Sequence, residues 1–250
     1  IQKTAMIGLG QIRNVFPPLG HPQHPGPEYE TLNMVYDVDL ANRLLDEVIP
    51  NRGSDGFRTL PSGESFKYLI GATPAFGPWP DVAEQSARFF KAVGINAEAK
   101  ISERSLFTNQ WRSNQLHAAV FQMDRTADLF VWPIHQTCSA VNCWWGTEIG
   151  RWFATGGENG FEPSQEIKDN YALYLKGLTL RPEESAPLAQ KIYKWLAENQ
   201  VESVVISTSP MAMGVVVVNK DLGNVPESWA NDGTFNTPWP SFPEQFYFKR

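Results

Sequence analysis

The sequence predicts an α/β fold in which helices connect the strands of a sheet. Between residues 66 and 123, stretches typical of strands alternate with stretches typical of helices, in the order strand, helix, strand, helix, strand. The strand stretches are apolar runs or alternate apolar with polar residues, and the helical stretches repeat apolar residues every three or four positions. With 250 residues, 42% of them hydrophobic, the chain can bury a substantial core.

The first elements follow from caps, turns and periodicity. Asp37 or Asp39 can cap a helix whose apolar stripe contains Leu44 and Leu45, and Pro50 ends it. A turn follows at residues 51–56. The next elements expected are a strand at Phe66–Ile70, a helix from Pro80 to Gly94 with Phe89 and Phe90 facing the core, a strand at Ile95–Ile101, a helix starting at Ser102 or Glu103, and a buried strand at His117–Met123.

The rest of the chain is predicted to be more helical. Helices are expected from Pro163 to Lys176 and from Arg181 through Leu196, followed by strands at residues 204–206 and 215–218. The tail after Asn224 reads as irregular, and so do residues 1–36, where closely spaced prolines exclude a helix or central strand. His21 and His24 in this proline-rich stretch are interpreted as parts of a solvated loop.

Several classes of function are disfavoured by composition. The formal net charge is −6 and basic residues are scattered, so we expect no nucleic-acid partner. The longest apolar run, Val215–Val218, is far shorter than the roughly 20 residues of a membrane span. The chain has no Gly-x-Ser-x-Gly elbow, no phosphate-binding loop and no complete dinucleotide motif, so we expect neither catalytic residues nor a cofactor.

The two cysteines, Cys138 and Cys143, leave two interpretations open. They are either two buried thiols or, in an oxidising compartment, a local disulfide. A tetrahedral zinc site needs two further ligands, and His135 is the only nearby candidate, so we expect no metal site.

Several short motifs follow one another along the chain in a recognisable order. The helix Ala41–Glu47 is followed by the turn Asp55–Arg58 and then by the turn Pro61–Glu64. The helix and strand between Val82 and Ile101, and the late helix from Arg181, come after them. In order and spacing these motifs resemble those of family 5 bacterial extracellular solute-binding proteins, which include the oligopeptide-, dipeptide- and nickel-binding proteins of ABC importers.

This resemblance implies a particular architecture. It implies a type II periplasmic-binding-protein-like lobe with a mixed sheet, helical crossovers and irregular terminal segments. Family members are longer and have two lobes around a cleft, so the chain would be the C-terminal lobe, and its N-terminal lobe would be missing. The expected parts are a hinge-proximal segment at 1–36, the α/β lobe at 37–207, and a tail at 208–250 that returns towards the missing lobe.

The same resemblance implies that the loop after residues 117–123 faces the cleft, where the carboxyl ends of strands also favour a ligand. Asp124, with Asp128 as second choice, best matches an Asp that pairs with the ligand's amino terminus, while Met123 stands near the place of a Trp in peptide binders. The tryptophans could stack on a flat ligand or pack in the core. The expected ligand-binding residues are Gln122, Met123, Asp124, Arg125, Asp128, Trp132, Trp144 and Trp145.

The function implied is capture of a peptide or another small solute by hinge closure, for delivery to an ABC transporter permease. The location implied is the periplasm or the extracellular space, with a lipid anchor left open. Two alternatives remain: a hydrolase that uses Asp124 and Asp128 as a carboxylate pair, and a surface interaction or chaperone module. We expect a binding protein and no enzyme.

Overall fold

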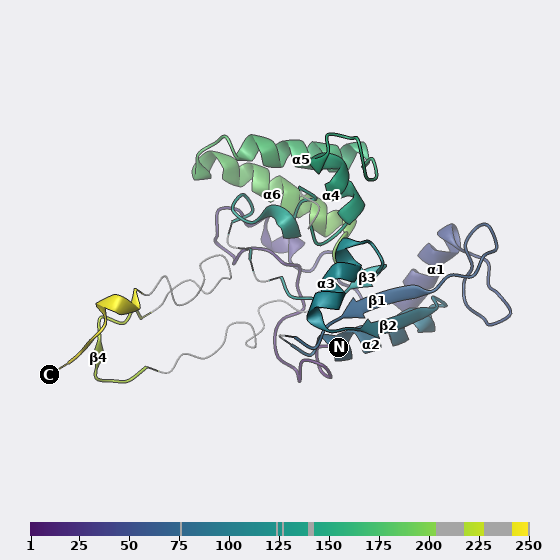
Figure 1. Ribbon diagram of the computed structural model, residues 1–250, viewed down its shortest axis with the longest axis horizontal. Coiled ribbons are helices and arrows are strands. Elements are labelled where there is room, and N and C mark those ends of the chain that lie inside the picture. The colour runs from purple at the N-terminus through teal and green to yellow at the C-terminus, as the bar shows by residue number, and fades with distance from the viewer. Residues whose placement is uncertain are drawn as a thin grey trace. The chain divides into compact units, whose positions relative to one another are not determined.

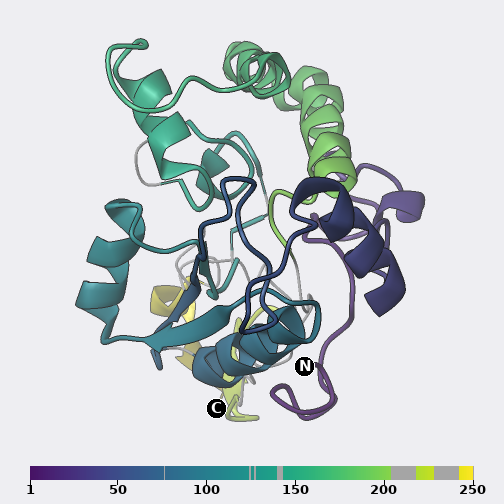
Figure 2. The same cartoon turned by 90° about the vertical axis from the view of Figure 1, so that its right-hand side faces the viewer.

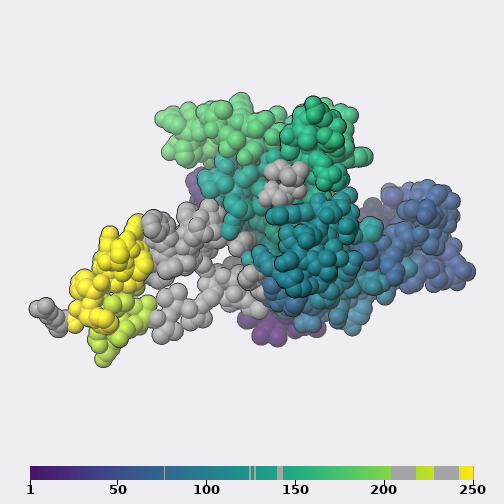
Figure 3. Space-filling model, in the orientation of Figure 1, coloured from purple at the N-terminus to yellow at the C-terminus, as the bar shows by residue number. Residues whose placement is uncertain are grey.

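The computed structural model describes residues 1–75, 77–123, 125–126, 128–139, 143–203, 218–227 and 242–249; the residues drawn in grey in Figures 1 and 3 lie outside these ranges. The chain divides into two compact units. Unit 1 comprises Ile1–Gly8 and Met34–Gln122, and unit 2 comprises Leu9–Asn33 and Met123–Arg250. The three-part organisation expected from the sequence refers to a missing lobe, and it stays a prediction.

Unit 1 contains a three-stranded parallel sheet in the order β2-β1-β3 (Figure 1). Its strands are β1 (Tyr68–Ala72), β2 (Ala97–Ile101) and β3 (Ala118–Ala119). The α/β prediction is therefore confirmed. In the described residues this sheet has no antiparallel strand of the kind that a mixed sheet would require. The third strand is also shorter than expected and only half-buried, although the amide of Val120 still bonds to the carbonyl of Gly71 at 2.8 Å.

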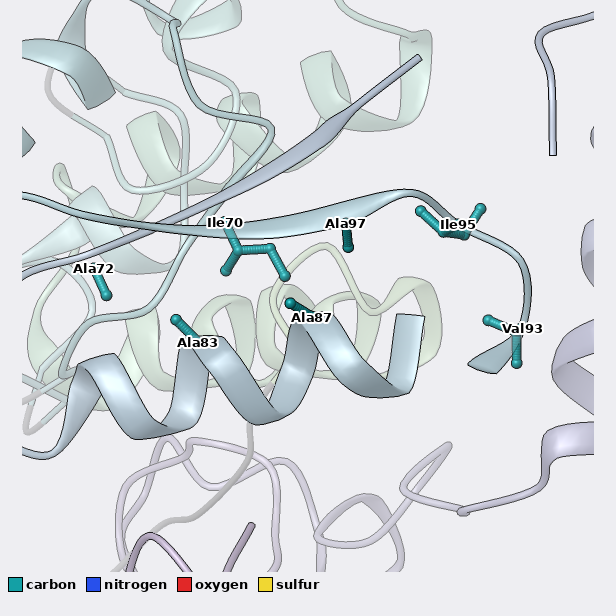
Figure 4. Close-up of a cluster of buried hydrophobic side chains, with 7 residues drawn as sticks. All are labelled: Ile70, Ala72, Ala83, Ala87, Val93, Ile95 and Ala97. Atoms are coloured by element: carbon teal, nitrogen blue, oxygen red, sulfur yellow. The ribbon is translucent and has the colours of Figure 1, made fainter. Parts of the chain in front are cut away.

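Helix α2 (Trp79–Ala92) covers one face of this sheet and α3 (Arg104–Arg112) connects β2 to β3. Alanines on α2 let the helix lie close to the strands, so that a compact apolar cluster forms between them (Figure 4). The cluster consists of Ile70, Ala72, Ala83, Ala87, Val93, Ile95 and Ala97. Phe89 and Phe90 do not face this core: they are 43% and 38% exposed, because their rings cover Tyr36 and Tyr68 near the surface.

Helix α1 (Val38–Val48) begins where the sequence predicted, because the Asp37 carboxylate accepts a hydrogen bond from the amide of Leu40 at 2.8 Å. Its predicted stripe is only partly buried. Leu45 packs against the core of unit 1, whereas Leu44 is 53% exposed.

Arg58, from the second family-like motif, is the largest fully buried side chain. Its guanidinium donates to the Asp46 carboxylate at 2.6 Å and to the side-chain oxygen of Asn42 at 3.0 Å, both on α1. It also donates to the carbonyl of Val93 at 2.9 Å, just after α2. One arginine thus joins both helices to the turn that carries it.

Unit 2 is largely helical. It contains α4 (Thr147–Ala154), α5 (Gln165–Gly177) and α6 (Pro182–Asn199), and α5 and α6 lie side by side (Figures 1 and 2). The helices predicted from Pro163 and from Arg181 are confirmed with small shifts of their ends. The buried core of unit 2 comprises Phe16, Leu129, Ala189, Ile192, Tyr193 and Ala197.

The proline-rich segment Leu9–Asn33 has no long regular element, as expected, and contains one short 3-10 turn, η1 (Pro27–Tyr29). It nevertheless packs on α6: the Gln190 amide donates to the carbonyl of Pro22 at 2.8 Å, and the Asn33 amide donates to the carbonyl of Ala197 at 3.2 Å. The interpretation of His24 as part of a solvated loop is wrong. His24 is 7% exposed, since its ring packs on Phe16.

A two-stranded antiparallel ladder joins β4 (Leu222–Gly223) to β5 (Tyr247–Phe248), which follows the 3-10 turn η5 (Pro243–Gln245). Strand β5 corrects the prediction of an irregular tail, because its partner lies more than twenty residues earlier and local sequence does not reveal the pairing. The strands predicted at 204–206 and 215–218 lie outside the described residues, apart from Val218.

Candidate functional site

The predicted ligand-binding residues begin where one compact unit ends and the other starts. Gln122 is the last residue of unit 1, and Met123 begins the second segment of unit 2. Asp124, the first choice as partner of a ligand amine, lies outside the described residues. Of the remaining predicted residues, Arg125, Asp128 and Trp132 precede the 3-10 turn η2 (Pro133–His135), and Trp144 and Trp145 lead into α4.

Arg125 and Trp132 are brought together. The guanidinium carbon of Arg125 lies 3.9 Å from the centre of the Trp132 ring, a cation–π contact that holds the flat group against the indole. In the described part of the chain no carboxylate, including that of Asp128, forms an ion pair with Arg125. The edges of the guanidinium keep their donors, which suit a carboxylate or another anionic oxygen.

Asp128 has a local structural role. One of its carboxylate oxygens accepts hydrogen bonds from the Gln23 amide at 2.9 Å and from the backbone amide of Phe130 at 2.9 Å. The Gln23 side-chain oxygen in turn accepts from the amide of Leu129 at 3.0 Å, and Gln23 is only 4% exposed. The carboxylate therefore fixes the turn before η2 and anchors the proline-rich segment.

The tryptophans after the cysteines are engaged in internal packing. Trp144 stacks on His135 with ring centres 5.4 Å apart, and Trp145 lies against Trp195 of α6 at 6.2 Å. This favours the core-packing interpretation for both rings. The indole N–H groups of Trp132 and Trp145 are buried and have no acceptor among the described residues, so each can donate to a bound water or ligand.

Cys138 and Cys143 are free thiols in the structure, and both are buried. Each sulfur donates to the carbonyl oxygen of Trp145, at 2.7 Å for Cys138 and 2.9 Å for Cys143. Burial, and then the hydrogen bond with Cys143, raises the pKa of the Cys138 thiol far above its usual range.

A small cavity of about 20 Å³ lies within unit 2 and is large enough for one water molecule. Apolar side chains, Met123 among them, line it together with Asn14 and with Gln136, whose buried amide nitrogen and oxygen have no hydrogen-bond partner among the described residues. Glu202 lines it too: the residue is partly exposed, but its carboxyl group is enclosed. Desolvation, with a smaller effect of Cys143, raises the Glu202 pKa well above its usual value.

Two polar residues at the carboxyl edge of the sheet were missed by the sequence analysis. Thr73 follows β1 and is fully buried, and Ser102 follows β2 and is 9% exposed. The Ser102 hydroxyl donates to the side-chain oxygen of Gln110 at 3.2 Å. Each of them is the first polar residue after its strand, a signal that is visible in the sequence. The predicted ligand-binding residues were taken only from the segments after the third strand.

A larger open groove, of about 660 Å³, lies in unit 1 along α2 and β2. It is lined by charges of both signs, including Asp81, Arg88 and Lys91, and by none of the predicted ligand-binding residues. Its apolar lining consists of alanines, with none of the aromatic side chains that small-molecule sites favour.

The described ranges contain neither a metal site nor a membrane-spanning helix. No three His, Cys, Asp or Glu side chains there come close enough to share a metal ion. Among the described helices, none combines the length and apolar character needed to cross a lipid bilayer.

No protein-family model matches the chain, and no curated protein sequence matches it significantly. Solved structures do match. An oligopeptide-binding protein OppA is 24% identical over 100% of this chain, with a TM-score of 0.72. AppA from Bacillus subtilis, solved with a nonapeptide, is 12% identical over 100% of the chain, with a TM-score of 0.67.

A third match is NikA from Brucella suis, solved with Fe(III)-EDTA, at 15% identity over 99% of the chain and a TM-score of 0.59. The chain spans only 41%, 44% and 45% of these three proteins. The fold is therefore that found in part of a solute-binding protein. The expected resemblance holds at the level of the fold, which the chain shares with parts of OppA, AppA and NikA among other solved structures.

Proposed function

We propose that the chain forms the second lobe of the substrate-binding component of an ABC importer. The observation that carries this proposal is the alignment of the entire chain with part of OppA at a TM-score of 0.72. Because the alignment covers the whole chain, it supports the architecture of a binding-protein lobe for the entire sequence. The ligand has to be argued from the residues of the site, since one fold can serve many ligands.

In this proposal the lobe contributes one wall of a cleft that closes about a hinge. Arg125, held flat on Trp132, recognises an anionic or planar polar group of the solute, and the Trp132 indole N–H supplies a further donor. Asp124 remains the proposed partner of a ligand amine, and Gln122 and Met123 directly precede it in sequence. The solute is a peptide or another small molecule, since the ligands named for AppA and NikA differ in chemistry.

The location proposed is the periplasm or the extracellular space, with a transporter permease as the partner of the closed form. A protein matched from Thermotoga maritima is described as a periplasmic oligopeptide-binding protein, which supports this location. A lipid anchor in a longer form of the protein is compatible with the same role.

The proposal assigns no enzymatic activity. The hydrolase alternative needs Asp124 and Asp128 as a free carboxylate pair, but an oxygen of Asp128 already accepts two hydrogen bonds that fix its own turn. An interaction or chaperone module would bind partners independently of small solutes, and no observation on the described residues favours it.

The test is to recover the native polypeptide that carries this sequence from cell envelopes and to identify its bound small molecules by mass spectrometry. One solute is expected, at close to one mole per mole of protein. The Arg125→Met variant should lose this solute, because the guanidinium that contacts it is removed. The control is Arg43→Met on the exposed face of α1, which should retain the solute. Recovery of no solute from the native form, or the same solute content in both variants, contradicts the proposal.

A further inference from the structure

Two buried sulfur atoms converge on one acceptor in unit 2. The Cys138 and Cys143 thiols both donate to the carbonyl oxygen of Trp145, at 2.7 and 2.9 Å, so the sulfurs cannot be further apart than the sum of these short distances. Cys138 is 2% exposed and Cys143 is fully buried. The pair therefore meets without any large movement of the backbone.

We propose that Cys138 and Cys143 form a structural disulfide that closes the loop leading to Trp144, Trp145 and α4. Disulfide bonds require Cα atoms within about 7 Å and side chains that point towards each other. The two sulfurs converge on one carbonyl oxygen, and the thiols also form a hydrogen bond with each other, so both side chains reach the same point. The link with the proposed function is the compartment, since an extracytoplasmic protein folds where such bonds persist.

The chemistry is thiol–disulfide exchange with a low-molecular-weight disulfide such as oxidised glutathione. One cysteine thiolate attacks the oxidant and releases one small thiol, which leaves a mixed disulfide. The second thiolate displaces the other small thiol and forms the internal S–S bond. Two S–H bonds are lost and one S–S bond forms, while the oxidant takes up the two electrons and two protons as two thiols.

The timing of this reaction follows from burial. The thiolate is the reactive form, and in the folded unit the Cys138 thiol is enclosed and its pKa is raised, so an external oxidant reacts slowly. The bond therefore forms while unit 2 folds, before the sulfurs are enclosed. Once formed, it resists reduction in the native state for the same reason.

The crosslink acts on the start of α4. Gly146, the residue before this helix, has a left-handed conformation with φ of 61°, and the Cys138 sulfur lies 3.2 Å from where a side-chain carbon there would stand. A bond between the cysteines would hold this corner, and with it the contact between Trp145 and Trp195. By loop-closure entropy a ring of this size raises the melting temperature by about 4 to 8 °C.

The test is to refold the chain in a reduced/oxidised glutathione buffer or in excess dithiothreitol, to alkylate it after unfolding, and to count labelled cysteines by mass spectrometry. The oxidised preparation should carry no label and melt at the higher temperature, and the reduced preparation should carry two. The folded oxidised protein should stay unlabelled during a short treatment with dithiothreitol. Two labelled cysteines after refolding with glutathione overturn the proposal.

Single variants give the matched controls. In dithiothreitol, Cys138→Ser and Cys143→Ser should each carry one label. In the glutathione buffer the remaining cysteine should be either labelled or joined to one glutathione, which the mass distinguishes, because no second thiol can form the internal bond. Neither variant should show the rise in melting temperature with the oxidant. If either variant fails to fold, the thiol count and the melting temperature of the unmodified chain still decide the matter. The assay involves no solute and no transporter, so its failure is distinct from failure of the proposed function.

Discussion

Arg58 shows how one residue can hold unit 1 together. The Arg58 side chain is 1% exposed, and its guanidinium donates hydrogen bonds to Asp46, Asn42 and the carbonyl of Val93. A buried arginine with such partners is satisfied, and its removal takes a charged donor away from each of these acceptors.

Replacement of Arg58 by methionine is expected to lower the free energy of unfolding by about 2 to 3 kcal/mol, because the backbone carbonyls of Val93 and Ile49 lose a charged donor. The Asp46 carboxylate is 58% exposed, so water can replace the lost ion pair there. Urea denaturation followed by circular dichroism measures the change. Arg43→Met, on the exposed face of α1, should change stability by no more than roughly 0.5 kcal/mol. Equal stability of the two variants would show that the Arg58 contacts contribute little.

At the same scale, two of the residues predicted for the candidate site are in contact, whereas a third has a structural role that the sequence did not reveal. Arg125 and Trp132 were both predicted, and they are in contact. Asp128 was expected at a ligand, but its hydrogen-bond partner Gln23 lies 105 residues away in the chain. A carboxylate engaged by such a distant residue looks the same in sequence as one that is free to bind a ligand.

Among the elements, α4 ends in a turn that depends on glycine. Gly160 has a φ of 96°, and a side-chain carbon there would lie 2.3 Å from the carbonyl oxygen of Glu148. Gly156, in the same turn, has a φ of 63° and nothing within 4 Å of that position. A side chain at Gly156 would therefore meet backbone strain alone, whereas a side chain at Gly160 would meet both backbone strain and a steric collision.

Gly156→Ala is expected to cost about 1 kcal/mol, the penalty for a left-handed residue with a side chain. Gly160→Ala is expected to cost at least about 2 kcal/mol more, because the added carbon also collides with backbone that cannot move independently of α4. Thermal melting of both variants measures the difference. Similar losses of stability would mean that the turn rearranges freely.

Helices proved more predictable than strands for a physical reason. The cap at Asp37 and the apolar repeats of α5 and α6 are local signals, and the structure confirms them. Strand β5 exists because it pairs with β4, which lies far from it in the sequence. Strand β3 comprises only residues 118–119, and the local sequence does not show where its pairing stops. The prediction that Phe89 and Phe90 face the core was wrong, because the alanines on another face of α2 already fill the space against the sheet.

For the whole molecule, the order of motifs gave the fold, and structural comparison confirmed it. What the sequence did not reveal is the division into two compact units with the boundary at Gln122 and Met123, because each unit takes residues from two separate parts of the chain.

If the chain is one lobe of a two-lobe clamp, the purified 250-residue chain should show no measurable shift in melting temperature with dipeptides, a nonapeptide or nickel. Stabilisation by a ligand depends on its concentration relative to the dissociation constant, and a single wall of a cleft supplies too few contacts for tight binding. Differential scanning fluorimetry measures the shift. A rise of several degrees with any of these ligands would show that the chain binds solute without a second lobe.

The docking of Leu9–Asn33 on α6 also has a consequence for biosynthesis. The Gln190 side chain bonds to Pro22, 168 positions earlier. A ribosome therefore releases the proline-rich segment long before its docking surface has been translated, and that segment must wait while most of unit 1 emerges and folds. Completion of unit 2 is thus a late event with high contact order, and the nascent chain exposes Phe16 to water until α6 arrives.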